Sequence, residues 1–96
     1  MKLKMFTVYD SKCGAYLPPF YMQSTGQAMR TFEDTCNDVN HAFAKHPEDY
    51  TLFELGTFDD NMGIIEQYTT SIPLAKAIEM CVASEDTPIN LESVKS

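Results

Sequence analysis

The 96-residue sequence has no tryptophan, only four glycines and only three cysteines. With so few glycines, it contains no glycine-rich loop that could hold a phosphate group at a helix N-terminus. The cysteines, Cys13, Cys36 and Cys81, are far apart, include no C-x-x-C pair and are odd in number. This spacing favours reduced thiols in a cytoplasm over a framework of disulfides.

Long apolar runs are also missing, because no stretch reaches the roughly 18 residues that a membrane-spanning helix needs. The first ten residues, MKLKMFTVYD, lack the continuous apolar segment of a secretory signal. We therefore expect a protein that is neither membrane-bound nor secreted. Its length suits one domain, and its 44% of hydrophobic residues is typical of a globular chain.

Basic residues are scarce, and the net charge is −7. Residues 1–30 carry four cations and one acid, whereas residues 31–96 carry three cations and thirteen acids. Because affinity for phosphates comes largely from lysine and arginine, any contact with DNA should use the first thirty residues. The acidic remainder should face solvent or a basic protein partner.

The N-terminal half predicts two strands and a helix. Lys2–Tyr9 alternates as a strand with both faces partly apolar. Ala15–Met22 reads as a returning strand, but Pro18-Pro19 places it at a sheet edge or breaks it. Ser24 and Gln27 form a capping box, which predicts a helix from about Thr25 to Asp38. Its apolar stripe comprises Ala28, Met29, Phe32, Cys36 and Val39.

The C-terminal half predicts a hairpin. Asn40–Asp49 reads as a loop with a helical turn around Ala42–Lys45, stopped by Pro47. Tyr50–Phe58 and Ile64–Tyr68 are strand-like and flank Asp59-Asp60-Asn61-Met62-Gly63, which favours a turn. Leu74–Val82 suits a short helix whose inward residues would be Leu74, Ala75, Ile78 and Cys81 or Val82.

The order of elements is β-β-α-β-β-(α), which predicts an α+β domain with a mainly antiparallel sheet and one main helix packed on one sheet face. We place this single domain at residues 1–83 and expect residues 84–96 to form a flexible C-terminal tail, because apolar density falls from Ser84.

Clusters of polar residues suggest no catalytic, cofactor or metal site. The carboxylates of Glu48, Asp49, Glu54, Asp59 and Asp60 lack a nucleophile with a nearby base, and we expect structural or solvated roles for them. Cys36, His41, His46 and Asp38 match no zinc spacing, so a buried thiol and two loop histidines are the simpler reading. We therefore expect a protein that is not an enzyme.

Aromatic and basic residues are interleaved near the N-terminus. Proteins that bind single strands combine a cationic groove with aromatic side chains on which bases stack. Such a site would use Lys2, Lys4, Tyr9, Lys12, Tyr16, Phe20 and Arg30. The alternative, which the acidic net charge favours, is that these aromatic residues fill the core.

Three segments carry a family resemblance: MKLKMFTVYDSK, PPFYMQSTGQAMRTFEDTCND and HPEDYTLFELGTFDD. In this order, the chain resembles the small nonstructural protein of gokushoviruses, single-stranded DNA bacteriophages of the Microviridae, over roughly Met1–Ile78. The resemblance implies a phage protein of the host bacterial cytoplasm, absent from the mature capsid. It also implies DNA binding, or a role in viral DNA replication and packaging, and carries over no catalytic residue.

Two hypotheses follow. In the first, a phage accessory protein binds single-stranded DNA through its first two strands and Arg30. In the second, an acidic protein-interaction module docks on a replication, procapsid or host factor without touching DNA. Its docking face would comprise Glu33, Asp34, Asp38, Asp59 and Asp60. The free sheet edges are also compatible with a homodimer.

Overall fold

The computed structural model describes the backbone of residues 1–85 and the side chains of residues 1–81. Five strands form one antiparallel sheet, which confirms the predicted α+β class. The strands are β1 (Lys2–Asp10), β2 (Ala15–Tyr16), β3 (Phe20–Met22), β4 (Tyr50–Asp59) and β5 (Ile64–Lys76). β1 pairs with β2 and β3 on one side and with β4 on the other, and β5 forms the far edge.

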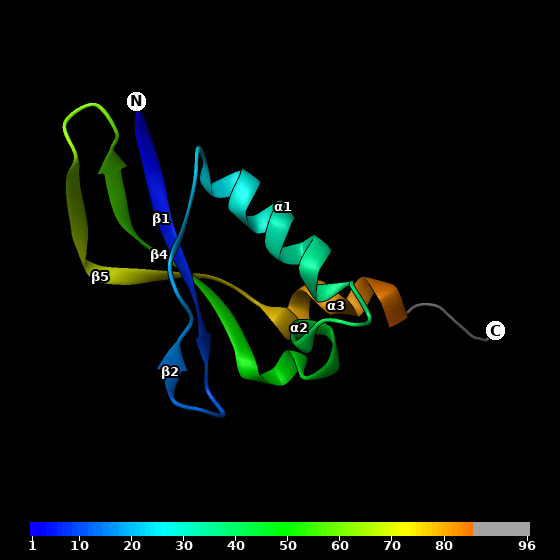
Figure 1. Cartoon of the computed structure of the whole chain (residues 1–96). Coiled ribbons are helices and arrows are strands. Elements are labelled where there is room, and N and C mark those ends of the chain that lie inside the picture. Colours follow the sequence, from blue (N-terminus) through cyan, green and yellow to red (C-terminus); the bar gives the residue numbers. More distant parts are fainter. Residues whose placement is uncertain (86–96) are drawn as a thin grey trace.

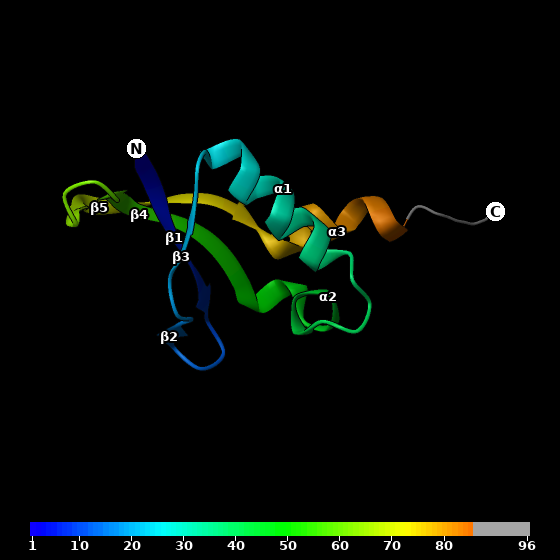
Figure 2. The same ribbon diagram turned by 45° about the horizontal axis from the view of Figure 1, so that its top comes forward.

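Three α-helices and one 3-10 helix complete the described part of the chain. They are α1 (Thr25–Cys36), α2 (Ala42–Lys45), η1 (Pro47–Asp49) and α3 (Ala77–Glu85). Figures 1 and 2 place the helices toward one end of the molecule, and the turn between β4 and β5 at the other end beside the N-terminus. Within residues 1–85, no helix is both long enough and apolar enough to cross a membrane.

The helices cover one face of the sheet. Phe6 and Val8 of β1, with Leu52 of β4, pack against apolar residues of the helices. The helical members of this core are Ala28, Phe32, Cys36, Phe43, Ala77 and Cys81. We call this side the helix face and the opposite side the open face. As the sequence predicts, α1 is the main helix, and Ser24 caps it by accepting the Gln27 amide at 3.1 Å.

The double proline divides the second strand as predicted. β2 and β3 are separate short strands, and both pair only with β1 at the edge of the sheet. The segment between them folds back over β1, where the Thr7 hydroxyl donates a hydrogen bond to the Leu17 carbonyl at 2.6 Å. The predicted helical turn over Ala42–Lys45 is also present as α2.

Helix α1 ends two residues before the predicted boundary near Asp38. The Asn37 side-chain amide donates to the Glu33 carbonyl at 2.9 Å, and the helix ends at Cys36. Val39 therefore lies beyond the helix and is 77% exposed rather than part of the apolar stripe.

The end of the second hairpin also differs from the prediction. β5 continues beyond Tyr68 to Lys76, because Pro73 and Ala75 pair with Phe53 and Leu52 of β4. The following helix therefore begins at Ala77, and Ile78 is 46% exposed instead of inward-facing. α3 extends two residues into the segment predicted as a tail, and residues 86–96 lie outside the described residues.

Candidate functional site

Aromatic side chains gather on the open face of the sheet. Tyr9 of β1 and Tyr16 of β2 are paired residues whose rings lie 4.7 Å apart, measured between centroids. Phe53 of β4 lies against Tyr16 at 6.0 Å, with its ring nearly perpendicular. The Tyr16 side chain is 56% exposed, so this cluster offers a ring surface to solvent.

A second aromatic pair lies on the same face toward the turn between β4 and β5. The rings of Tyr21 and Phe58 are 5.6 Å apart. Between the two aromatic groups is a hollow of about 340 Å³. Its walls are Thr7, Tyr16, Leu17, Pro19, Leu55, Gln67 and Ser71. From Leu3, which pairs with Phe58, to Tyr9 the open face spans about 20 Å along β1.

Two lysines flank the first aromatic cluster. Lys12 lies in the turn that joins β1 to β2, directly beyond the Tyr9–Tyr16 pair. Lys76 pairs with Thr51, which in turn pairs with Tyr9, so these three residues form one row across the sheet. Because paired residues of an antiparallel sheet share a face, Lys76 stands on the open face with Tyr9.

Of the seven residues predicted to bind DNA, three lie together: Tyr9, Lys12 and Tyr16. Phe20 instead turns to the core and stacks on Phe6 at 5.7 Å. Arg30 is exposed on α1, which covers the helix face. The predicted residues therefore do not form one continuous surface.

Lys2 and Lys4, the other two predicted cations, belong to the helix face and already have acidic partners. Lys2 Nζ is 3.8 Å from a carboxylate oxygen of Glu66. Lys4 Nζ is 3.5 Å from Glu54 Oε2 and 3.4 Å from the Thr25 hydroxyl oxygen. A DNA phosphate could recruit Lys4 only by competing with the Glu54 carboxylate.

Glu54 anchors a polar network between the sheet and the start of α1. Its side chain is nearly buried, and its two oxygens accept hydrogen bonds from Thr25 at 2.8 Å and Tyr68 at 2.6 Å. Burial by itself would raise the pKa of Glu54, but these bonds and the charge of Lys4 together hold that pKa below its ordinary value. The bond to Glu54 also raises the pKa of Tyr68. This carboxylate, for which the sequence predicts a structural or solvated role, is therefore structural.

The five acids predicted as a docking face are split between two regions. Glu33, Asp34 and Asp38 lie on α1 or just after it, whereas Asp59 and Asp60 lie at the hairpin turn (Figure 1). Asp38 accepts the Asn40 amide at 3.1 Å, and Asp59 accepts the Asn61 amide at 3.0 Å. Asp60 pairs with the N-terminal ammonium group at 3.0 Å. Glu33 and Asp34 are exposed on α1.

The cysteine and histidine residues considered as a metal cluster have structural contacts. His41 accepts the Phe43 amide at 3.1 Å and so caps α2. Cys36 is buried, and its carbonyl accepts a hydrogen bond from the Cys81 thiol at 2.8 Å. Burial raises the pKa of Cys36 to about 12, and the interaction with Cys81 adds to this shift. A hydrogen bond with the side chain of Asp10 raises the pKa of exposed Cys13, so at neutral pH both thiols stay protonated.

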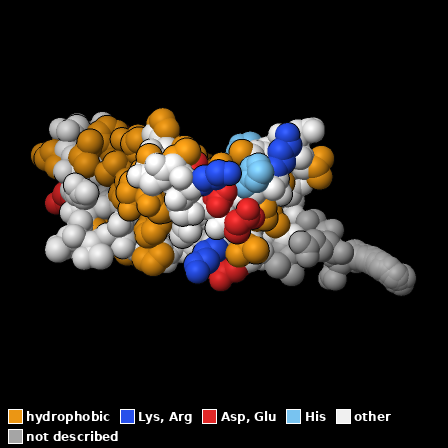
Figure 3. All heavy atoms as spheres, turned by 90° about the horizontal axis from the view of Figure 1, so that it is seen from below, with side chains coloured by type: hydrophobic (Ala, Val, Ile, Leu, Met, Phe, Trp, Pro, Cys, Tyr) orange, Lys and Arg blue, Asp and Glu red, His pale blue; other side chains and the backbone are white. Residues whose placement is uncertain are grey.

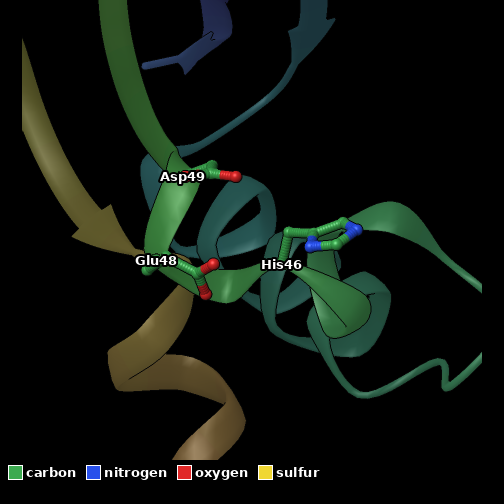
Figure 4. A group of neighbouring side chains, drawn as sticks. All are labelled: His46, Glu48 and Asp49. Carbon is green, nitrogen blue, oxygen red and sulfur yellow. The ribbon is translucent and has the colours of Figure 1, made fainter. Parts of the chain in front are cut away.

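A different group comes together on the segment that joins α2 to β4. His46, Glu48 and Asp49 each offer a ligand atom within 4.8 Å of the others (Figure 4). His46 and Glu48 are exposed, and Asp49 is half-buried. Exposed carboxylates gather in this way without binding an ion, so we assign no metal to the group.

Sequence reasoning missed Phe53, Lys76, Tyr21 and Phe58 as members of the open face. The alternation of Tyr50–Phe58 signals that Phe53 and its neighbours point to opposite sides. Which side faces the helices depends on strand register, which is a property of the fold. The extension of β5 to Lys76 likewise depends on pairing with β4.

Comparison with known proteins gives one informative result. Neither the curated proteins nor the solved structures contain a significant match. A model of the phage ORF5 protein family matches residues 3–80, which include helices α1 and α2 and all of the five strands except the first residue of β1. The chain therefore belongs to the phage ORF5 protein family.

Proposed function

We propose that this phage protein is a non-enzymatic accessory factor in viral single-stranded DNA replication or packaging, and that its open face binds single-stranded DNA in the host bacterial cytoplasm. The observation that carries the proposal is the Tyr9–Tyr16–Phe53 cluster between Lys12 and Lys76, in which Tyr16 is exposed and Tyr9 and Phe53 are half-buried. Aromatic rings stack on any base, and lysines neutralise the adjacent phosphates. The resemblance to gokushovirus nonstructural proteins supports the same role.

The chemistry of this face predicts weak and sequence-independent binding. Two lysines that each contact one phosphate give a slope of about −1.4 for the logarithm of affinity against the logarithm of salt concentration. Each stacked base contributes about 1–3 kcal/mol. Affinity should therefore depend more on the tyrosines than on the few cations of this acidic chain.

The test is fluorescence anisotropy of a labelled single-stranded oligonucleotide at low and at moderate salt. Tyr16→Ala should weaken binding by roughly 5- to 150-fold, which corresponds to the loss of one stacked base. Lys12→Glu should weaken it and flatten the salt dependence. Lys45→Glu, which makes the same charge change on α2 away from the open face, is the matched control and should change neither quantity. No binding even at low salt would refute direct contact with DNA.

The acidic protein-interaction module remains a second candidate, and the net charge of −7 favours it. In that case Glu33 and Asp34, which are exposed on α1, would meet a basic surface of a replication, procapsid or host protein. Asp34→Lys would then abolish binding to that partner, while Tyr16→Ala would leave it unchanged. The two variants therefore separate the candidates by which of them loses function in infected cells.

A further inference from the structure

The free edge of β5 is open to another strand over only part of its length. Asp60 donates its amide to the Met1 carbonyl at 3.1 Å, which sets the direction of the hydrogen bonds between β4 and β1. The backbone groups of successive residues in an antiparallel strand point alternately to the two neighbouring strands. The backbone N–H and C=O groups of Thr57 and Asp59 in β4 therefore point toward β5. The backbone groups of their partners, Glu66 and Ile64, form hydrogen bonds with β4. The backbone N–H and C=O groups of Ile65 and Gln67 therefore point away from the sheet, toward the free edge.

The other half of the same edge is closed. Pro73 of β5 pairs with Phe53 of β4, whose backbone groups form hydrogen bonds with β1 and not with β5. The backbone nitrogen of Pro73 therefore faces the free edge, where it has no N–H to donate. A proline at this position prevents a further strand from pairing. Between the two halves, the backbone of residues 68–71 is not paired with β4, and β5 changes direction there (Figure 1). The unprotected part of the edge is thus the segment Ile64–Gln67.

This unprotected segment carries an exposed isoleucine on each face. Ile65 is 56% exposed on the open face beside Phe58, and Ile64 is 46% exposed on the opposite side. On the face seen in Figure 3, hydrophobic side chains gather toward the end that carries the hairpin, and most of the charged side chains visible there lie further toward the helical end. An apolar edge with unpaired backbone groups is a template for another strand.

The charges near the free edge of β5 indicate which kind of partner strand could pair with it. In a chain of net charge −7, this end of the sheet holds three cationic groups, the N-terminal ammonium group, Lys2 and Lys4. They are ion-paired with Asp60, Glu66 and Glu54, and among the side chains of residues 1–81 Asp59 is the one further acid at this end. The hairpin end is therefore close to neutral, so two copies can approach each other here with little repulsion. A basic partner would instead be attracted to the acidic remainder of the chain.

We propose that two copies of this chain pair antiparallel through the Ile64–Gln67 segment of β5, forming one continuous sheet. An antiparallel edge can pair with itself about a two-fold axis normal to the sheet. A register centred on Ile65 pairs each Glu66 with Ile64 of the other copy, so the two Glu66 carboxylates do not face each other. The same axis places both open faces on one side, where they form a single longer surface. This inference does not depend on DNA binding.

Sedimentation of the purified protein over a range of concentrations tests this pairing. The wild-type chain should shift from monomer to dimer as concentration rises. Gln67→Pro removes an outward N–H, as Pro73 does further along the edge, and should leave a folded monomer. Ile65→Lys should also give a monomer, whereas Ile78→Lys on α3, where the isoleucine is 46% exposed, should still dimerise.

Amide hydrogen exchange gives a second and independent measurement. The amides of Ile65 and Gln67 should exchange rapidly in dilute protein and become protected as the dimer forms. The amide of Glu66, which already bonds to β4, should be protected at every concentration. A chain that stays monomeric, or a dimer that survives both Gln67→Pro and Ile65→Lys, would overturn the proposal.

Discussion

Glu54 gives the sharpest test of what holds this fold together. The change Glu54→Gln keeps the size of the side chain but removes its charge. In the wild-type chain the carboxylate is only 4% exposed and accepts hydrogen bonds from Thr25 and Tyr68. It also lies 3.5 Å from the Lys4 ammonium. The substitution makes both hydrogen bonds neutral, and one hydroxyl must now accept from the new amide N–H instead of donating, because the amide keeps only one acceptor oxygen. It also leaves the ammonium without its carboxylate.

The size of the effect follows from these contacts. A hydrogen bond to a charged group contributes about 1.5–3 kcal/mol and a neutral one about 1 kcal/mol, so two conversions cost about 2 kcal/mol. We add nothing for Lys4, because its side chain is 39% exposed and water screens the ion pair. For a chain of this length, a loss of about 2 kcal/mol lowers Tm by roughly 8–16 °C.

Thermal unfolding followed by circular dichroism measures the change. Glu33→Gln, which removes an exposed acid from α1, is the matched control and should shift the free energy of unfolding by less than about 0.5 kcal/mol. Tyr68→Phe removes one of the two donors, and the double variant should lose less than the sum of the two single changes, because they share a bond. A Glu54→Gln protein with the Tm of the control would refute the network as a source of stability.

Two further predictions concern the same region of the sheet. Because the folded-state pKa of Glu54 is lowered, its contribution is present above its ordinary pKa of 4.5 and is lost as pH falls through the folded-state value. The difference in unfolding free energy between wild type and Glu54→Gln should therefore shrink in urea titrations below about pH 4.5, and a constant difference would contradict this assignment. Gly56→Ala should destabilise the fold by about 3 kcal/mol or more, since the added Cβ would clash with the Glu66 carbonyl oxygen. Gly26→Ala in α1, where nothing lies within 4 Å of the added Cβ, should be neutral or slightly stabilising, and equal effects of the two changes would refute the close approach of β5 to β4.

The sequence alone was sufficient to predict the class of fold and most of its elements. Alternating residues indicated β1 and the hairpin of β4 and β5, and the Ser24 cap located the start of α1. These signals are local, because they depend on side chains that are neighbours along one strand or one helical turn. The double proline likewise acts locally, by removing backbone donors from the strand in which it stands.

The end of β5 required the tertiary structure. Leu74–Val82 has the apolar spacing of a helix, yet its first three residues extend a strand as far as Lys76. Pairing with Thr51 and Leu52 of β4 outweighs the local preference, and helix formation is delayed to Ala77. This pairing brings Lys76 into one row with Tyr9, so a residue from the acidic part of the sequence joins the candidate DNA-binding face.

The sequence therefore determined which residue types were available: a few tyrosines and lysines near the N-terminus, and an acidic remainder. Only the tertiary structure decided which of them share a surface. Consecutive residues of a strand point to opposite faces, so Lys4 and Phe20 fall on the helix face while Tyr9 and Tyr16 fall on the open face. A shift of one residue in register would exchange the two sets, and that register is fixed by the burial of Phe6, Val8 and Leu52 beneath the helices.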